Sequence, residues 1–435
     1  MLIKSIYTHT FERNGRFYLF NSCSGVFCEI SQETYSAIYD RSYTKLGKST
    51  LEFLTKNKVL VEEDEKYLFY LESKSKFLGE TNNDSALGLV IAPTIQCNFN
   101  CPYCFESKTD NSIMSDEVEI QLINFIKRHT NVKVINLTWY GGEPLLAFNR
   151  IKSIWNKFRT ELPDIKIQNH SIITNGWLIT DSVIEFFRHT SLSFIQITLD
   201  GIRENHNKTR CLKDGTPTFS RIYRNIIHLA KSIPSLEITV RVNVNRANPD
   251  DYAILSSAFK NEGINNISVY PGFIREDTLD GHSLTYNSIS GDACHEFFLQ
   301  ASNHGIRTSF FPSVCNSKGC LMSSAYAFII GPVGEIYKCW NDVGVAERAV
   351  GSVALQDAED TRRYNDSLYY DYMLYDATED VECRDCKFLP ICMGGCPFRR
   401  RGNGNRCVDK KYIMEEYLRE CATVLMRTES QTPCQ

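Results

Sequence analysis

Strand and helix signals alternate from about residue 86 to residue 270, and this alternation limits the fold more than any other feature. Short apolar runs predict strands at 87–92, 134–139, 170–173, 194–199, 238–244 and 267–270. Amphipathic segments between them predict helices at 116–128, 149–159, 181–188, 219–231 and 251–260. Strands that alternate with helices pair in parallel, so we expect an α/β sheet or barrel. Functional residues should then lie at the carboxyl ends of the strands.

Two regions flank this core and differ from it. In residues 1–84, the pattern predicts paired strands over 16–30, helices at 32–40 and 49–56, and a closing hairpin from 59–61 and 66–70. This content predicts a winged-helix-like unit, and the polar segment 72–84 predicts a linker. After about residue 310, cysteines and glycines become dense and periodicity fades, which indicates a third, metal-held region. We therefore expect domains at 1–84, 85–310 and 311–435.

Charge and hydropathy exclude several classes of partner. The formal net charge is −4, and residues 1–84 contain 11 Lys and Arg against 12 Asp and Glu, so we expect no nucleic-acid partner. The N-terminus lacks the apolar core of a signal peptide, and no apolar run is long enough to span a bilayer. We therefore expect a cytoplasmic protein without a membrane partner.

The chain contains 17 cysteines, and their spacing indicates metal binding rather than disulfides. Cys97, Cys101 and Cys104 follow the first predicted strand with the spacing C-x3-C-x2-C, and Tyr103 precedes the last of them. Three thiolates leave one iron of a [4Fe–4S] cluster without a protein ligand, and this iron can bind a reactant. A zinc site that lacks its fourth ligand is the alternative.

The motif C-x3-C-x-aromatic-C after a first strand resembles the radical SAM superfamily. The resemblance implies a partial (βα)6 barrel in which the open iron binds S-adenosyl-L-methionine (SAM), and reductive cleavage of SAM gives a 5′-deoxyadenosyl radical. Three further segments at strand ends match the family: 141–144 (GGEP), 174–176 (TNG) and 198–210. By resemblance, the cofactor-binding residues are Tyr103, Gly141, Gly142, Glu143, Asn175, Thr198 and Arg210.

The C-terminal cysteines resemble the SPASM extension of this superfamily, which binds two auxiliary clusters. The resemblance implies three [4Fe–4S] clusters in total. It assigns Cys315, Cys320, Cys339 and Cys396 to one auxiliary cluster, and Cys383, Cys386, Cys392 and Cys407 to the other. A zinc ribbon on Cys383, Cys386, Cys392 and Cys396 is the alternative. Cys421 is an alternative to Cys407 as the last ligand.

The N-terminal 84 residues loosely resemble the leader-binding element of maturases that act on ribosomally synthesised and post-translationally modified peptides (RiPPs). This favours a precursor peptide with a leader as partner, oxidative thioether or carbon–carbon crosslinking as the reaction, and a reducing partner such as flavodoxin or ferredoxin. A structural cap is the alternative for this region. A sulfatase maturase that forms formylglycine is the main alternative for the enzyme, although Trp340 occupies the place of its general base. Asp342 is then the candidate catalytic base. The non-enzymatic alternative is an iron–sulfur electron carrier.

Overall fold

The computed structural model describes residues 2–63, 65–104, 106, 112–245, 248–274, 297, 320–354, 366–401, 407 and 410–429. They form two compact units. The terminal unit contains residues 2–79 and 376–429, and the central unit contains residues 80–274 and 320–375. These units do not follow the three consecutive segments expected from the sequence, because the two ends of the chain share one unit.

The central unit is built on one sheet with the strand order β11-β10-β9-β8-β7-β6-β12-β13-β14. Six neighbouring strands run parallel and confirm the predicted α/β sheet: β6 (Ala86–Ile91), β7 (Val134–Trp139), β8 (Lys166–Thr174), β9 (Phe194–Leu199), β10 (Glu237–Val244) and β11 (Ile267–Phe273). Beyond β6, the sheet continues with β12 (Ala327–Ile330), β13 (Glu335–Tyr337) and β14 (Gly351–Ser352), which were not predicted. Part of the cysteine-rich C-terminal region therefore belongs to the central sheet.

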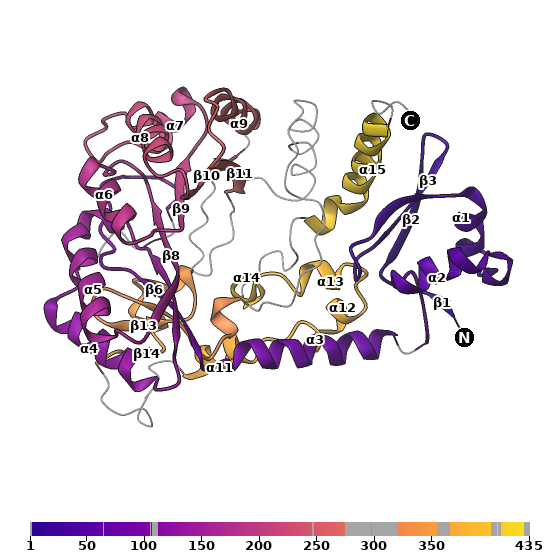
Figure 1. Cartoon of the computed structure of the whole chain (residues 1–435), viewed down its shortest axis with the longest axis horizontal. Helices are drawn as coiled ribbons and strands as arrows, with labels where there is room; N and C mark the ends of the chain where they lie inside the picture. The colour runs from indigo at the N-terminus through magenta and orange to yellow at the C-terminus, as the bar shows by residue number, and fades with distance from the viewer. Residues whose placement is uncertain are drawn as a thin grey trace. The chain divides into compact units, whose positions relative to one another are not determined.

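Helices cover one face of this sheet (Figure 1). They are α4 (Asp116–Arg128), α5 (Phe148–Glu161), α6 (Asp181–His189), α8 (Phe219–Ser232) and α9 (Asp251–Asn261), all predicted, with the unpredicted short helix α7 (Arg203–Thr209). Local signals explain their limits: α4 begins where the Ser115 side chain accepts the N–H of Val118. Their apolar sides pack on fully buried strand residues such as Ile195 and Ile197 of β9.

The opposite face of the sheet is polar. Successive side chains of a strand point to opposite faces, so the residues between the buried ones lie here. Thr138 and Ser171 are joined by a hydrogen bond of 2.8 Å, and the Tyr270 hydroxyl donates to Gln196 Oε1 at 2.8 Å. We call this side the inner face; its residues include Thr138, Ser171, Gln196, Thr198, Arg241, Asn243 and Tyr270.

The terminal unit contains an antiparallel sheet with the order β2-β3-β4, formed by β2 (Thr8–Arg13), β3 (Arg16–Asn21) and β4 (Phe27–Ile30). One core joins Leu19 of this sheet to α1 (Gln32–Tyr39) and α2 (Lys48–Lys56). A second core joins Tyr18 and Phe20 to Phe388 and to α15 (Lys410–Glu429). The sheet is therefore covered on both faces, one by N-terminal helices and the other by the C-terminal region.

Two predictions for the N-terminal region are wrong. Residues 66–70 do not close a hairpin and 72–84 is not a linker, because both lie largely in one long helix, α3 (Glu65–Thr81). The short strand β5 (Leu60–Val61) instead pairs with β1 (Ile3–Lys4). Lys, Glu and Leu are good helix formers, but α3 exposes apolar residues such as Leu68 and Leu71, so its sequence lacks the one-sided apolar periodicity used to recognise helices.

The remaining elements are short. The central unit contains the helix α11 (Asp366–Met373) and the 3-10 turns η2 (Pro144–Ala147), η3 (Leu321–Ser323), η4 (Trp340–Asp342) and η5 (Ala346–Arg348). The terminal unit contains η1 (Tyr43–Lys45), α12 (Val381–Arg384), α13 (Leu389–Cys392) and α14 (Pro397–Arg401). In the described part of the chain, no helix has the length and apolar character needed to cross a membrane.

Candidate functional site

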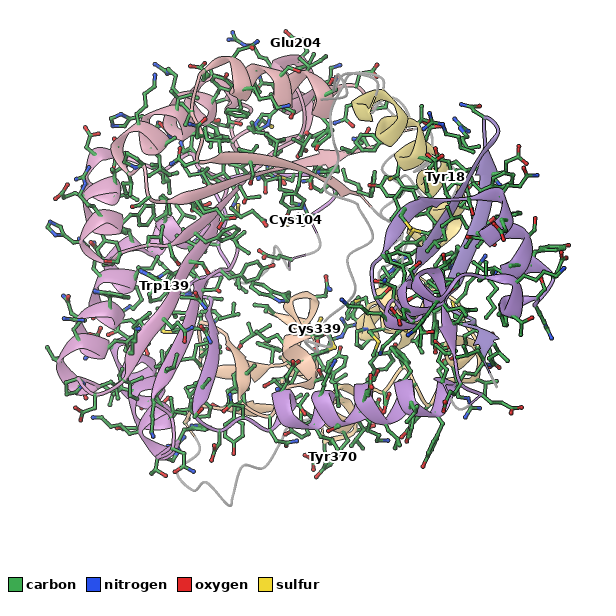
Figure 2. All side chains as sticks on the ribbon, turned by 45° about the vertical axis from the view of Figure 1, so that its right-hand side comes forward. Tyr18, Cys104, Trp139, Glu204, Cys339 and Tyr370 are labelled. Carbon is green, nitrogen blue, oxygen red and sulfur yellow. The ribbon has the colours of Figure 1, made fainter. Side chains whose placement is uncertain are left out.

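Three predicted cluster ligands lie in the loop that follows β6, which we call the cysteine loop (residues 94–104). Figure 2 shows Cys104 on the side of the sheet away from α4–α6. Cys101 is buried, and Cys97 and Cys104 are half-buried. Burial raises the pKa of Cys97 to about 12 and that of Cys104 to about 11. Such thiols keep their protons unless a cation replaces them, which is how iron–sulfur ligands are deprotonated.

Two glycines after β7 are required by the cysteine loop itself. A Cβ on Gly141 would lie 2.1 Å from the carbonyl oxygen of Thr94, and one on Gly142 would lie 2.3 Å from that of Ile95 and 2.5 Å from that of Gln96. Gly141 also has a φ of +116°. By resemblance these glycines bind the cofactor, and this role stays a prediction. The structure shows a close approach to the backbone that presents the cysteines.

Glu143 joins the loop after β7 to the end of β8. Its carboxylate is fully buried and accepts hydrogen bonds from Leu145 N–H (3.0 Å), Thr174 Oγ1 (2.7 Å) and Asn175 N–H (2.7 Å). Burial raises the pKa of Glu143, and these hydrogen bonds oppose the shift. Oε2 accepts one of the three bonds, which leaves a lone pair for a further donor such as an ammonium group.

Asn175, at the end of β8, contacts the cysteine loop, and its predicted role in binding the cofactor stays a prediction. Its Nδ2 donates to Asn98 Oδ1 at 2.8 Å and lies 4.0 Å from Cys97 Sγ. Its Oδ1 accepts the N–H of Trp177 at 3.0 Å. Because both ends of the amide are engaged, the side chain has a fixed orientation beside the first cysteine.

A buried network connects the cysteine loop to the ends of β9 and β10. Asp200 accepts hydrogen bonds from the Tyr103 hydroxyl, from Thr209 Oγ1 (2.7 Å) and from Asn243 Nδ2 (3.1 Å). Arg210 Nη1 donates to the Tyr103 hydroxyl at 3.1 Å. Burial raises the pKa of Asp200, and the Arg210 charge opposes this shift. Tyr103 and Arg210, which were both predicted to bind the cofactor, therefore lie together. Asp200 and Asn243, which were not predicted, hold Tyr103 in place.

Sequence reasoning missed Asp200 and Asn243, although one rule could have found them. Both stand at the carboxyl ends of parallel strands, where functional side chains gather. Thr198, which was predicted, lies half-buried on the inner face, two residues before Asp200. His206 is fully buried; its Nδ1 accepts the N–H of Asp200 at 3.2 Å and its Nε2 contacts Thr218 Oγ1 at 2.9 Å, so it supports this loop.

Glu106 is a further acidic residue that the sequence did not single out. Burial raises its pKa to about 7, and its carboxylate forms a hydrogen bond with Tyr140. Tyr140 contacts Trp340 edge to face, with ring centroids 4.6 Å apart. Trp340 directly follows Cys339, which Figure 2 shows on the same side of the sheet as Cys104. This part of the C-terminal region therefore packs on Tyr140, next to the two glycines after β7, within the central unit.

Asp342 has the surroundings of a structural ion pair. It is fully buried, Oδ2 accepts the Tyr372 hydroxyl at 2.9 Å, and Oδ1 lies 3.4 Å from Arg348 Nη1. A general base needs access to the proton that it removes. Its role as catalytic base stays a prediction, and these contacts favour anchoring of the segment after Cys339.

The predicted auxiliary ligands belong to both units. Cys320 and Cys339 lie in the central unit; Cys383, Cys386, Cys392, Cys396 and Cys407 lie in the terminal unit; and Cys315 lies outside the described residues. The described residues contain no group of three His, Cys, Asp or Glu side chains placed around a single metal ion. Each thiolate of a [4Fe–4S] cluster binds a different iron, so its ligands stand farther apart than around one ion. The assignment of these cysteines to two clusters remains a prediction.

The residues around the cysteine loop fit a [4Fe–4S] cluster that carries an amino acid ligand. The loop presents three soft thiol ligands, and Glu143 Oε2 keeps a lone pair that an ammonium group could use. Arg210 Nε is buried and has no hydrogen-bond partner among the described residues. Such an unsatisfied donor is costly, and an anionic or polar group bound beside the loop would satisfy it.

The central region is similar to known sequences. Residues 91–255 match the family model described as the radical SAM superfamily. The cysteine-type anaerobic sulfatase-maturating enzyme of Clostridium perfringens is 24% identical over 371 residues, which cover 76% of this chain and 94% of the relative. The radical SAM cyclopropyl synthase TigE of Paramaledivibacter caminithermalis is 26% identical over 264 residues, which cover 52% of this chain and 54% of TigE.

Two solved structures share the fold. The enzyme anSMEcpe, with bound AdoMet and Cp18Cys peptide, aligns with a TM-score of 0.58 at 20% identity and covers 80% of this chain and 100% of its own. Streptococcus suis SuiB, bound to precursor peptide SuiA, aligns with a TM-score of 0.54 at 16% identity and covers 94% of this chain and 99% of its own. At these identities the likeness concerns the fold alone.

Proposed function

We propose that this chain, which is a radical SAM enzyme, installs an oxidative crosslink, a thioether or a carbon–carbon bond, in a ribosomally synthesised precursor peptide. The observation that carries the proposal is the antiparallel sheet β2-β3-β4 of the terminal unit, in which β4 is an edge strand. An edge strand can bind an extended leader peptide by main-chain hydrogen bonds, as a winged-helix-like recognition element does. A bound leader would raise the effective concentration of the peptide to be modified.

The register of β4 shows which main-chain groups a leader would meet. Asn21 N–H donates to the carbonyl of Val26 at 3.0 Å, and Leu19 pairs with Cys28. Hydrogen bonding alternates along an antiparallel pair, so the main-chain groups of Cys28 point to β3 and those of Glu29 point away from it. The other edge strand, β2, is less free to bind a peptide. One of its main-chain carbonyls, that of Glu12, already accepts a hydrogen bond from Arg419 of α15.

The solved structures support a peptide substrate. SuiB was crystallised with its precursor peptide, and its fold covers 94% of this chain, against 80% for anSMEcpe. The additional coverage fits a protein that carries a recognition element next to its radical SAM domain. Both neighbours are known with a bound peptide, so the shared fold suits substrates of this class.

The cofactors of this proposal follow from the family. Cys97, Cys101 and Cys104 would hold a [4Fe–4S] cluster, which together with bound SAM would supply radical chemistry. In the SPASM assignment, the C-terminal cysteines would hold two auxiliary clusters whose chemistry is electron transfer. An external reductant such as flavodoxin or ferredoxin completes the proposal. Anaerobically reconstituted protein should contain about twelve irons, four per cluster; about four irons with stoichiometric zinc would reject the SPASM assignment.

The chain's own residues position and shield this chemistry. Glu143 is placed to accept an ammonium group, and Arg210 Nε to donate to a bound polar group. Tyr103, Asp200 and Asn243 hold the cysteine loop against the strand ends. Their burial excludes water from the same region, which protects a reactive intermediate from side reactions.

Formation of formylglycine is a second candidate function, and the sequence relatives favour it. Cysteine-type and serine-type sulfatase-maturating enzymes match 70–76% of this chain at 23–26% identity. Against it, Trp340 follows Cys339, and Asp342 contacts Arg348 and Tyr372. A sulfatase peptide that is converted to formylglycine by the purified enzyme would place this function first.

The leader proposal is tested by a main-chain substitution in β4. Glu29→Pro removes an outward N–H, whereas Glu29→Ala keeps it and removes only the side chain, which pairs with exposed Arg16. The full-length enzyme is co-expressed with each short open reading frame found beside its gene, and peptide masses are recorded. Once a substrate is found, calorimetry measures leader binding by both variants.

We expect Glu29→Pro to weaken leader binding at least tenfold, by loss of about one main-chain hydrogen bond and distortion of the edge, while Glu29→Ala binds normally. Equal binding by all three proteins would reject strand addition at β4. Deletion of residues 1–84 is a poorer test, because it would expose the core that Tyr18 and Phe20 form with Phe388.

A further inference from the structure

An arginine on the inner face has no acidic partner among the residues that the structure describes. Arg241 lies on β10, beside Thr198 of β9 and Tyr270 of β11 in the sheet register. It is half-buried, and its neighbours in these strands are neutral polar residues. A partly buried charge without a counter-ion destabilises the folded protein, and an anionic ligand would offset that cost.

The guanidinium group of Arg241 is held in one orientation. Nε donates to Asn243 Oδ1 at 2.9 Å. A Cβ on Gly272 of β11 would lie 2.4 Å from Nε and 2.9 Å from Nη2, so the glycine leaves the space that the group occupies. With Nε engaged, the planar group keeps its terminal N–H donors for another partner.

Arg241 shares the face of the sheet that the cysteine loop contacts. Arg241 and Asn243 are two residues apart on β10 and therefore point to the same face. Asn243 Nδ2 donates to Asp200 at 3.1 Å and to the Tyr103 hydroxyl at 3.3 Å. One side chain thus connects the orientation of Arg241 to the residues around the cluster ligands.

We propose that Arg241 is a specificity-determining residue that binds a carboxylate of the peptide substrate on the inner face. This rests on the proposed function for the peptide, and the ligand is an Asp or Glu side chain or a terminal carboxylate. A guanidinium binds a carboxylate through two parallel hydrogen bonds, which fixes the position as well as the charge of its partner. SAM also carries a carboxylate, so the experiment must separate the two sources.

Chemical modification of the reconstituted full-length enzyme distinguishes a peptide carboxylate from the carboxylate of SAM. Phenylglyoxal modifies accessible arginines, and peptide mass mapping gives the rate at each one. The arms contain no ligand, SAM alone, SAM with N-acetylglutamate amide, and SAM with the neutral N-acetylglutamine amide. Arg203 of α7, which is exposed, serves as the internal reference.

We expect N-acetylglutamate amide at about ten times its Kd to slow modification of Arg241 about tenfold, because only about a tenth of the enzyme then stays unoccupied, with no change at Arg203. Calorimetry should show a similar loss of affinity for this probe in Arg241→Gln but not in Arg203→Gln. Full protection by SAM alone would assign the carboxylate to SAM and overturn the proposal. Equal protection by the neutral amide, or none by either probe, would also overturn it. The assay needs no peptide maturation, so its outcome is independent of the reaction proposed above.

Discussion

The cysteine loop and the C-terminal run from Cys383 to Cys396 are both cysteine-rich, but they are held in different ways. The cysteine loop contacts residues far away in sequence, namely the glycines after β7 and the end of β8. The C-terminal run is organised by neighbouring residues: Cys383 N–H donates to Asp380 Oδ1 at 3.1 Å, and Cys386 N–H donates to the carbonyl of Cys383 at 3.0 Å.

This difference teaches which changes should disturb each region. The geometry of the cysteine loop depends on the whole parallel sheet, so remote substitutions at the strand ends should displace its thiols. The C-terminal run depends on local turns and on contacts with the N-terminal sheet, where Ser22 Oγ donates to the carbonyl of Lys387 at 2.8 Å and Phe388 packs with Tyr18 and Phe20. Substitutions in the central sheet should leave it intact.

The largest expected effect comes from removing the ligands of each region. Replacing Cys97, Cys101 and Cys104 together by Ala should abolish reductive cleavage of SAM and leave about eight of about twelve irons, since four irons belong to each cluster. The matched variant, with Cys383, Cys386 and Cys392 replaced, should lose iron but still cleave SAM. Iron analysis and 5′-deoxyadenosine chromatography are the measurements. Undiminished 5′-deoxyadenosine from the first variant would rule out the cysteine loop as the catalytic site.

A single added methyl group at Gly142, which is distant in sequence from the cysteine loop, should displace the backbone of that loop. In Gly142→Ala the new Cβ meets two backbone carbonyls, which cannot yield as a side chain could. We expect a loss of about 3 kcal/mol in the free energy of unfolding and loss of SAM cleavage. The control is Gly79→Ala in α3, where a Cβ meets nothing within 4 Å. If both variants unfold at the same denaturant concentration, the close approach is not a constraint.

Two buried histidines, one in each unit, allow the stabilities of the two units to be compared as a function of pH. His170 of the central unit and His9 of the terminal unit each have a pKa lowered by burial to about 4. Both are neutral when folded and take up protons more readily when unfolded. Each should therefore contribute stability above about pH 6.5 that is lost as the pH falls toward 4, up to about 3 kcal/mol per group. Thermal unfolding between pH 7 and pH 4 measures the loss.

Substitution by Phe should separate the two histidines. His170 Nε2 accepts the indole N–H of Trp139 at 2.8 Å, so His170→Phe should cost about 2 kcal/mol at pH 7. His9 stacks on Phe388 and forms a hydrogen bond with the backbone of Lys387, whose carbonyl also accepts from Ser22 Oγ. Its Nε2 has no partner among the described residues, so His9→Phe should cost less, at most about 1 kcal/mol. In each variant, the unfolding temperature should fall less between pH 7 and pH 4 than it does in the wild type. Equal costs at pH 7 would contradict the difference drawn from their contacts.

The smallest expected effect concerns Asp342. In Asp342→Asn the ion pair with Arg348 is lost but the volume is kept, so we expect a loss of about 1 kcal/mol in stability and little change in turnover. The pH–rate profile is the decisive measurement, because a general base would appear in it as an ascending limb. A loss of activity of a hundredfold or more at unchanged stability would make Asp342 the catalytic base after all.

Sequence periodicity was sufficient to predict the six parallel strands of the central sheet and the helices between them, because these elements have strong and regular hydrophobic patterns. It failed in two physical situations. The helix α3 is largely exposed and carries apolar residues such as Leu68 and Leu71 on its surface, so its sequence has no one-sided apolar pattern and was mistaken for a hairpin and a linker. The strands β12, β13 and β14 are only two to four residues long, which is too short for alternation to be recognised.

The sequence by itself determined which residues can do chemistry here: the spacing of Cys97, Cys101 and Cys104, and the motifs that follow the next three strands. Spacing is local, and soft thiolate ligands have few other uses in such a pattern. Only the tertiary structure decided what those motifs contact. Gly141 and Gly142 fit the cysteine loop, Asp200 and Asn243 hold Tyr103, and the two ends of the chain share one core. These contacts join residues separated by many positions, and packing rather than local preference selects them.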